Sequence, residues 1–367
     1  MEEDSTRIAT FAGPALAARV HCLRLLDGPD AGRRFMIGPE GATIGRTPPA
    51  DIVFPDPEVS RAHCRLAARG DDLVVTDLGS TNGAFVDGVR VQAPTSLPVG
   101  GVLRVGRQSL EHERRTENEI AAAEELDRDL AKAAAYIQAL LPPPLAEGPI
   151  RADWAYQPSA KLGGDAFGYG ALPDGRFAFY LMDVSGHGAG AAMHSVAVMN
   201  LLRQRALPNT DLADPGQVLA TLNDMFQMEE HAGLFFTMWY GVFDPASRRL
   251  DFASAGQHPA YLKPTGGGEL TPLRARGGLI GAIPGKRYVT ESAVAPPGAS
   301  LYLFSDGVFE IVTVDDLQWT LTDFLPLILG TTAGGAGECQ RIFQAVTGVA
   351  RPGGLDDDFS LVALTFV

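Results

Sequence analysis

Cysteine is scarce in this sequence of 367 residues, and its few copies are not spaced for chemistry. The three cysteines, Cys22, Cys64 and Cys339, are odd in number and far apart, and no CxxC pair occurs. A disulfide framework needs paired cysteines, and a cysteine zinc site needs closely spaced ones. We therefore expect three reduced thiols without a structural or catalytic role.

Long apolar runs are also missing, and so is a basic leader. The first seven residues, MEEDSTR, are acidic where a secretory signal is basic. No uninterrupted apolar stretch approaches the ~20 residues that span a bilayer. The sequence predicts a soluble cytoplasmic protein that does not contact the membrane.

Positive charge is in deficit, with 30 Lys and Arg against 44 Asp and Glu, a formal net charge of -14. This balance disfavours a nucleic-acid partner, because such partners are held by neutralising phosphates. Residues 1–118 carry 14 basic and 16 acidic side chains, which leaves 16 and 28 for residues 119–367. The second part holds -12 of the charge, which fits either a solvated acidic surface or a carboxylate-lined cation site.

Turn chemistry and apolar periodicity divide the chain into four parts. Residues 1–19 form a tail, and residues 20–112 contain many short β-runs broken by turns, as in an all-β sandwich. Residues 113–149 form a helical linker that ends at the PPPLAEGP segment. Residues 150–367 mix strand hairpins with helices, which predicts an α+β sandwich with helices packed outside the sheets.

The linker helix, expected over 116–141, has apolar residues at alternating steps of four and three: Leu126, Leu130, Ala133, Ile137 and Leu140. This stripe is short and must be buried against another surface. Two surfaces are available: the same helix of a second chain, or the domain that follows. The spacing favours a homodimer through the linker helix.

Three short motifs of the β-rich part could hold a phosphate together. IGR at 44–46, VSRAH at 59–63 and GSTNG at 79–83 each lie between expected strands, where loops can converge at one end of a sandwich. Phosphate binding needs planar cationic groups together with hydroxyl or amide donors. Each motif alone is more typical of an ordinary turn.

In this order, the three motifs resemble the forkhead-associated (FHA) domain. The resemblance implies an eleven-stranded β-sandwich that binds phosphothreonine peptides. It implies that Arg46, Ser60 and Thr81 face the phosphate. It further implies that Asn82 holds the peptide backbone, while Arg61 and His63 support the loop. A phosphothreonine-bearing protein, such as a Ser/Thr kinase or its substrate, is the expected partner.

Aspartates of the second part are expected at the ends of apolar strands, with glycine nearby, in four motifs: GGD at 163–165, DVSGHG at 183–188, SDGV at 305–308 and DDDFS at 356–360. Hard divalent cations prefer carboxylate and carbonyl oxygens, and glycine lets the backbone approach closely. Two such cations held near each other can align a water for in-line attack on phosphorus. A single Asp-Gly is normally a turn, but four of them predict a metal site.

The order of these motifs resembles the SpoIIE-type branch of the metal-dependent PPM (2C-like) serine/threonine phosphatases. The resemblance implies two Mn²⁺ or Mg²⁺ ions. In it, Asp183 is shared by both ions, the Val184 carbonyl and Asp165 serve the second, and Asp306 and Asp357 hold the first. Asp357 is chosen over its neighbours because Asp357-Asp358-Phe359-Ser360 overlays the family's DDIT pattern.

Some positions depart from the family's pattern or have two interpretations. Gly168 stands where a second aspartate is common, and Gln257 stands where Gly-His-Asn is usual. His187 is either a general acid for the leaving oxygen or a structural residue of a glycine loop. No cationic residue for clamping the phosphate is evident in the motifs, although Lys161 is a candidate.

The sequence thus predicts a phosphoserine/phosphothreonine protein phosphatase of a bacterial signalling system, with an anti-sigma-factor antagonist as the substrate that the resemblance suggests. Asp183 and Asp306 are its expected catalytic residues, together with His187. One alternative is a phosphopeptide-binding scaffold with an inactive or weakly active phosphatase domain. Another keeps the enzyme but makes the FHA domain a regulatory or dimer surface.

Overall fold

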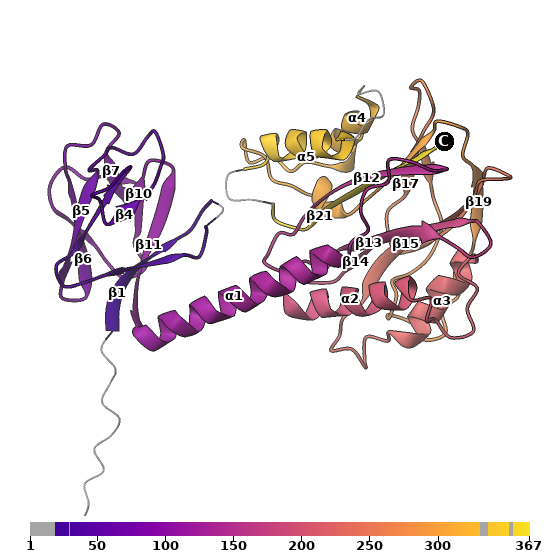
Figure 1. The fold of residues 1–367 in the computed structure, drawn as a ribbon, viewed down its shortest axis with the longest axis horizontal. Helices are drawn as coiled ribbons and strands as arrows, with labels where there is room; N and C mark the ends of the chain where they lie inside the picture. The colour runs from indigo at the N-terminus through magenta and orange to yellow at the C-terminus, as the bar shows by residue number, and fades with distance from the viewer. Residues whose placement is uncertain (1–18, 29, 331–336, 352–354) are drawn as a thin grey trace, which may run out of the picture. The chain divides into compact units, whose positions relative to one another are not determined.

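The computed structural model describes residues 19–28, 30–330, 337–351 and 355–367 (Figure 1). The expected N-terminal tail, residues 1–19, therefore lies outside the described residues except for Arg19. The chain forms two compact units, Met1–Asp129 and Leu130–Val367. In the described residues, none of the helices has the length and apolar character that crossing a membrane requires.

The N-terminal unit is a β-sandwich. Its six-stranded sheet has the order β2-β1-β11-β10-β7-β8, and its five-stranded sheet has the order β4-β3-β5-β6-β9. The strands are β1 (Arg19–Leu25), β2 (Arg34–Ile37), β3 (Ala42–Gly45), β4 (Ile52–Val53), β5 (Cys64–Arg69), β6 (Asp72–Asp77), β7 (Ala84–Val86), β8 (Val89–Arg90), β9 (Thr95–Leu97), β10 (Val102–Val105) and β11 (Gln108–Thr116). The expected all-β sandwich is confirmed.

Alternation along the strands creates the core of this unit. In β5, Cys64 and Leu66 are fully buried while Arg65 between them is exposed. The same period places Leu73 and Val75 of β6 in the core. Because successive side chains of a strand point to opposite faces, each sheet offers one apolar face to the other. Cys22 and Cys64 are free and fully buried, as expected for incidental thiols.

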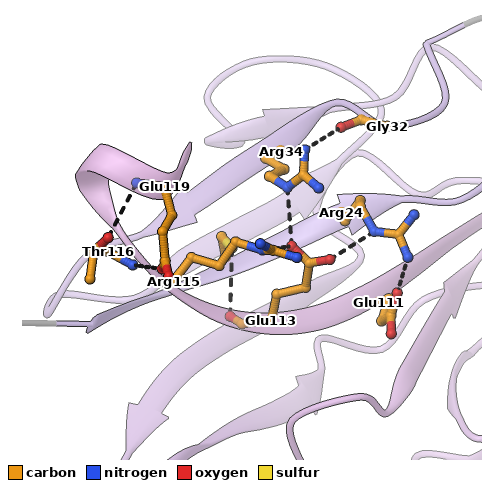
Figure 2. A network of polar contacts seen from close by, with 9 residues as sticks. Arg24, Gly32, Arg34, Glu111, Glu113, Arg115, Thr116 and Glu119 are labelled. Atoms are coloured by element: carbon orange, nitrogen blue, oxygen red, sulfur yellow. Dashed lines mark hydrogen bonds and ion pairs between the residues drawn. The ribbon is translucent and has the colours of Figure 1, made fainter. Parts of the chain in front are cut away.

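A network of charged residues covers part of the six-stranded sheet (Figure 2). Glu113 of β11 is its centre: it accepts from Arg24 Nε at 2.8 Å, Arg34 Nε at 3.0 Å and Arg115 Nε at 2.8 Å. Arg24 also contacts Glu111. Burial alone would raise the pKa of Glu113, but the hydrogen bonds from Arg115 and Arg34 lower it to about 2. The network ties β1, β2 and β11 together through one carboxylate.

Helix α1 (Glu117–Leu140) begins directly after β11, without an intervening loop. Thr116 and Glu119 form a capping box, seen in Figure 2. The Thr116 backbone N–H donates to Glu119 Oε2 at 2.8 Å, and the Glu119 backbone N–H donates to Thr116 Oγ1 at 3.2 Å. The box satisfies donors that would otherwise be free at a helix start, and so defines where the helix begins.

The C-terminal unit contains two five-stranded sheets with the orders β12-β21-β20-β17-β18 and β13-β14-β15-β16-β19. The strands are β12 (Ile150–Gln157), β13 (Ala166–Ala171), β14 (Phe177–Val184), β15 (Phe236–Asp244), β16 (Arg249–Ala255), β17 (Ala260–Lys263), β18 (Thr271–Leu273), β19 (Glu291–Val294), β20 (Ser300–Phe304) and β21 (Phe359–Phe366). Their pairing is antiparallel throughout.

Helices cover the outer face of each sheet of this unit (Figure 1). Helices α2 (Ala189–Arg203) and α3 (Pro215–Met225) pack on the sheet that contains β14, and α5 (Glu338–Val349) packs on β12 and β21 beside α4 (Leu321–Leu329). The apolar core fills the space between the sheets, with Trp239, Phe243 and Phe366 among its buried residues. The expected α+β sandwich with external helices is confirmed.

The second half of α1 packs within the C-terminal unit. Ile137 is buried in a small cluster with Leu162 and Ala192, and Leu130 packs against the same cluster. Leu126, in the first half of the stripe, is 59% exposed. The structure thus shows the docked-helix alternative for the second half, while the homodimer stays a prediction.

The Glu113 network makes a prediction about acid stability. Because the pKa of Glu113 is about 2 in the folded chain, against 4.5 ordinarily, its stabilisation is present above about pH 4.5 and is lost as the pH falls toward 2. We expect Glu113→Gln to lower the stability of the N-terminal unit by about 1–2 kcal/mol at pH 7 and to flatten its loss in acid.

Circular dichroism can follow unfolding of the β-rich N-terminal unit. Unfolding of the C-terminal unit is measured separately by tryptophan fluorescence, because all three tryptophans lie in that unit. Glu40→Gln, at an exposed position, is the matched control. Equal stability of the two variants at pH 7 would contradict the assignment.

Candidate functional site

Four acidic loops meet at one end of the C-terminal sandwich. Asp165 directly precedes β13, and Asp183 lies at the end of β14, whose Met182 pairs with Ala166. Asp306 follows β20 in a short 3₁₀ turn, η1 (Asp306–Val308), and Asp357 precedes β21. In an antiparallel pair the end of one strand lies beside the start of the next, so each sheet contributes two of the loops.

Glycines let these loops approach more closely than any side chain would allow. A Cβ at Gly164 would lie 2.7 Å from the Val184 carbonyl oxygen, and one at Gly307 would lie 2.2 Å from the Asp358 carbonyl oxygen. A Cβ at Gly163 would lie 2.5 Å from Asp358 Oδ2. Gly164 and Gly307 are therefore required by backbone contact, and Gly163 by contact with the Asp358 side chain.

Asp358, which the sequence reasoning did not single out, holds the loops together. Its Oδ1 accepts from the Ser159 backbone N–H at 2.7 Å and from Ser159 Oγ at 2.9 Å. Its Oδ2 accepts from the backbone N–H groups of Gly164 at 2.7 Å and Asp165 at 3.3 Å. Asp358 is 4% exposed, so both of its oxygens are occupied in a buried position.

Asp357 differs from its neighbour in exposure and in free oxygens. It is exposed, and among the described residues only its Oδ1 has a hydrogen-bond partner, the Asp358 backbone N–H at 2.8 Å. Ser305 fixes the backbone on both sides: its Oγ donates to the Asp358 carbonyl at 2.9 Å and accepts from the Ser360 N–H at 3.0 Å. These contacts support the choice of Asp357 as the ligand and give Asp358 a positioning role.

The aspartates raise one another's pKa. Burial is the largest cause at each position, followed by the charge of a neighbouring carboxylate. The pKa of Asp183 rises to about 7 through burial and Asp306, and that of Asp306 rises to about 6 through burial and Asp357. The pKa of Asp165 also rises, through burial and Asp183. The cluster therefore needs protons or cations to neutralise it.

The environment of one carboxylate oxygen in this cluster favours a bound cation. Among the described residues, Asp165 is 2% exposed and its Oδ2 is buried without a hydrogen-bond partner, although the hydroxyls of Ser360 and Ser305 are near enough to oppose the rise in its pKa. A buried carboxylate oxygen is costly unless a donor or an ion faces it. Across the described part of the chain, no three His, Cys, Asp or Glu side chains are placed so that they could hold a metal ion together. Of the divalent cations, Mg²⁺ needs the fewest protein ligands, because it keeps several waters and takes one or two carboxylates.

The remaining predicted residues lie around this edge. Val184 is buried, and its carbonyl faces Gly164. His187 is exposed between Gly186 and Gly188, which both have positive φ. Lys161 lies at a small hollow of about 230 Å³ beside Gly163.

The two positions that depart from the family pattern have structural roles. A Cβ at Gly168 would lie 2.6 Å from the Tyr180 hydroxyl oxygen, so that hydroxyl occupies the place of a side chain. Gln257 contacts Thr237, the partner of Asp183 across the strands, and donates to the Phe304 carbonyl at 3.1 Å. Gln257 thus links β15, the neighbour of β14 beside Asp183, to the end of β20 before Asp306.

In the N-terminal unit, the three expected phosphate loops also meet. The Arg46 N–H donates to the Ser60 carbonyl at 2.9 Å, and the Thr81 N–H donates to Ser60 Oγ at 3.1 Å. Asn82 Nδ2 donates to the Glu58 carbonyl at 2.8 Å. A Cβ at Gly45 would lie 2.1 Å from the Arg61 carbonyl oxygen, so this loop pair also depends on a glycine. The structure brings together the loops of all five predicted residues.

The buried His63 and the half-buried Asp77 support these loops, while the guanidinium groups of two arginines remain available. His63 is fully buried, and its Nδ1 accepts from the Ser60 N–H at 3.1 Å. Asp77 accepts from the N–H groups of Gly79, Ser80 and Ala84 within 2.7–2.9 Å. Among the described residues, the guanidinium groups of Arg46 and Arg61 have no recorded hydrogen bond or ion pair. Asp77, two residues before the start of the third motif, was not predicted.

Three consecutive aspartates allow a matched test of the positioning role of Asp358. In Asp358→Asn, an amide NH₂ replaces one oxygen and faces backbone N–H donors, so we expect a loss of about 1–3 kcal/mol in stability. Asp357→Asn keeps its recorded contact and relieves repulsion, and we expect no loss.

Asp356→Asn is the control, since it removes only a half-exposed ion pair with Arg351. Thermal unfolding followed by tryptophan fluorescence measures all three variants. The positioning role is rejected when Asp358→Asn unfolds at the same temperature as Asp356→Asn.

Family models match both units. The model for Stage II sporulation protein E (SpoIIE) matches residues 173–367, and the model for the FHA domain matches residues 42–106. Residues 173–367 make up just over half of the 367-residue chain. The two matched regions contain the strands that carry most of the two loop clusters.

Individual proteins agree with these matches. The chain is 28% identical over 171 residues to phosphoserine phosphatase RsbP of Bacillus subtilis, which covers 46% of this chain and 41% of RsbP. It is 36% identical over 96 residues to FHA domain-containing protein FhaB of Mycolicibacterium smegmatis, which covers 25% of this chain and 62% of FhaB. The chain thus spans less than two thirds of each of these curated relatives.

A solved structure supports the fold of the C-terminal unit. The SiaA-PP2C domain of Pseudomonas aeruginosa superposes with a TM-score of 0.58 at 18% identity, covering 67% of this chain and 99% of that domain. At this identity the likeness concerns the fold alone.

Proposed function

The chain belongs to the SpoIIE family, with an FHA domain before its phosphatase domain, and from this premise we propose that it is a metal-dependent protein phosphatase acting in the cytoplasm. It removes phosphate from phosphoserine or phosphothreonine of a bacterial signalling protein. The observation that carries this proposal is the convergence of four aspartates from separate loops, with a buried Asp165 oxygen that has no hydrogen-bond partner among the described residues.

The residues divide the work at the acidic edge. Two Mn²⁺ or Mg²⁺ ions would supply electrostatic stabilisation of the phosphoryl group and an activated water. Asp183 would contact both ions, Asp165 and the Val184 carbonyl the second, and Asp306 and Asp357 the first. Asp358 and the glycines keep these ligands in place. His187, exposed beside the edge, is the candidate for protonating the leaving oxygen.

The substrate and the FHA partner are inferred from chemistry and from relatives. RsbP is named a phosphoserine phosphatase, and an anti-sigma-factor antagonist is the substrate class that the family resemblance suggests. Arg46, Ser60 and Thr81 would bind the phosphate of a phosphothreonine protein, such as a Ser/Thr kinase, while Arg61 and Asn82 hold the peptide around it. The open guanidinium of Arg46 supports this assignment.

Removing the shared carboxylate tests the enzyme. We expect Asp183→Asn, and chelation of the wild type, to abolish hydrolysis of a small aryl phosphate, because both ions lose a common ligand. Calorimetric titration with Mn²⁺ should show weaker binding to the variant, while tryptophan fluorescence shows an intact fold. Retention of more than about a tenth of the activity, a barrier change under ~1.4 kcal/mol, would reject the assignment.

The same assay separates the enzyme from the scaffold alternative. A wild-type chain that binds Mn²⁺ but hydrolyses neither an aryl phosphate nor a phosphoserine peptide would favour the phosphopeptide-binding scaffold. Asp356→Asn, which alters an exposed acid outside the proposed ligand set, should retain wild-type activity.

The FHA domain has its own test. We expect Arg46→Ala to weaken binding of a phosphothreonine peptide by at least about tenfold, because a charge-assisted hydrogen bond is removed. Turnover of the aryl phosphate should not change. Arg69→Ala, at the opposite end of β5, is the matched control. Equal calorimetric affinity of the wild type for phosphorylated and unphosphorylated peptides would overturn the proposal.

A further inference from the structure

A second concave site lies in the C-terminal unit, away from the acidic loops. It is a cavity of about 320 Å³ between the segment that ends α1, strand β13 and helix α2. Small-molecule sites typically measure about 300–1,000 Å³ and are mostly apolar with a few polar groups. Its apolar lining includes Leu140, Phe167, Leu172, Met199 and Leu202.

The wall after α1 is held in place by hydrogen bonds. Trp154 Nε1 donates to the Pro142 carbonyl at 2.9 Å, and the Tyr169 hydroxyl donates to the Pro143 carbonyl at 2.8 Å. Both prolines line the cavity. The cavity is therefore formed before any ligand enters, which lowers the entropic cost of binding.

The polar groups that line this cavity include hydrogen-bond donors, both uncharged and positively charged. The Tyr180 hydroxyl and the Asn200 amide have no recorded hydrogen-bond partner among the described residues. Arg203 is exposed at the rim, near enough for its charge to lower the pKa of Tyr180 against the larger, raising effect of burial. Arg205, also at the rim, donates to the Ala171 carbonyl at 2.6 Å.

The charge of the lining differs from that of the unit around it. Two arginines and no acidic residue line the cavity, although residues 119–367 carry a formal charge of -12. Arg203 has no recorded ion pair among the described residues. Positive charge at the mouth of an apolar cavity is complementary to a molecule with an anionic head and an apolar body.

We propose that this cavity binds a small amphiphilic anion, with its apolar body among Phe167, Met199 and Leu202 and its head group at Arg203. The Tyr180 hydroxyl and the Asn200 amide would donate hydrogen bonds inside. Such a ligand touches α2, β13 and the end of α1 together, so it stabilises the docked position of the second half of α1. This inference does not depend on the phosphatase activity.

The first experiment uses the full-length chain and dodecanoate below its micellar concentration. We expect saturable one-to-one binding by calorimetry and a rise in the unfolding temperature measured by tryptophan fluorescence. Dodecanol and dodecyltrimethylammonium should bind at least about tenfold more weakly, because the first lacks the charge and the second reverses it. Absence of saturable binding, or equal binding of all three probes, would overturn the proposal.

The second experiment locates the site. Gly170 lines the cavity, lies two residues from Gly168 on the same face of β13, and a Cβ there would meet no atom within 4 Å. Gly170→Phe should therefore fill the cavity without disturbing the strand and abolish dodecanoate binding, whereas Gly170→Ala should retain it. Equal binding by these two variants would place the ligand elsewhere.

Charge reversal gives an independent measurement. Arg203→Glu should weaken dodecanoate binding by at least about tenfold but leave dodecanol unaffected. Arg151→Glu, at an exposed position of β12 that does not line the cavity, is the matched control. An equal loss in both variants would show only a nonspecific effect of charge and would contradict the assigned head-group position.

Discussion

The acidic site depends on backbone meeting backbone. Asp165 and Asp183 belong to one sheet and Asp306 and Asp357 to the other, so the site exists only if loops of two sheets touch. Gly163 allows that contact, since a Cβ there would lie 2.5 Å from Asp358 Oδ2, while Gly164 and Gly307 let loops of the same sheet lie against each other's carbonyl oxygens. The buried Asp358 carboxylate then joins the loops with four hydrogen bonds. The aspartates can therefore act on a metal ion only because glycines let their loops pack closely.

The aspartates of these loops lie close together, and the repulsion between their negative charges destabilises the folded chain. Asp306 raises the pKa of Asp183 and Asp357 raises the pKa of Asp306, and among the described residues Asp165 is buried without a hydrogen-bond partner for one oxygen. Neutral substitutions would relieve that repulsion, so the acids are retained against stability. The carboxylate of Asp358 instead stabilises the fold, because backbone N–H groups donate hydrogen bonds to it. Acids only one residue apart can thus have opposite effects on stability.

Much of this arrangement could be predicted from the sequence, for physical reasons. Strands, turns and Asp-Gly motifs are local patterns, so the two sandwiches and the four acidic loops were accessible. The role of Asp358 was not, because its partner Ser159 is 199 residues away in the chain. The seam of α1 was equally ambiguous. Steps of four and three suit a homodimer or a docked helix, and only the folded positions of Leu162 and Ala192 show one surface that covers Ile137.

Both predicted binding sites use the same construction. In each, a glycine lets one loop lie against a carbonyl oxygen of another: Gly45 against Arg61, and Gly307 against Asp358. In each, an acid beside the recognised motif accepts several backbone N–H groups, namely Asp77 in the FHA domain and Asp358 in the phosphatase domain. Because the carboxylate oxygens of these two acids accept the hydrogen bonds of the loop backbone, the neighbouring side chains remain available to a ligand. One residue therefore supports the loop while its neighbours are free to bind a ligand. A sequence motif that contains only the exposed binding residues consequently misses the acids that hold the loop in place.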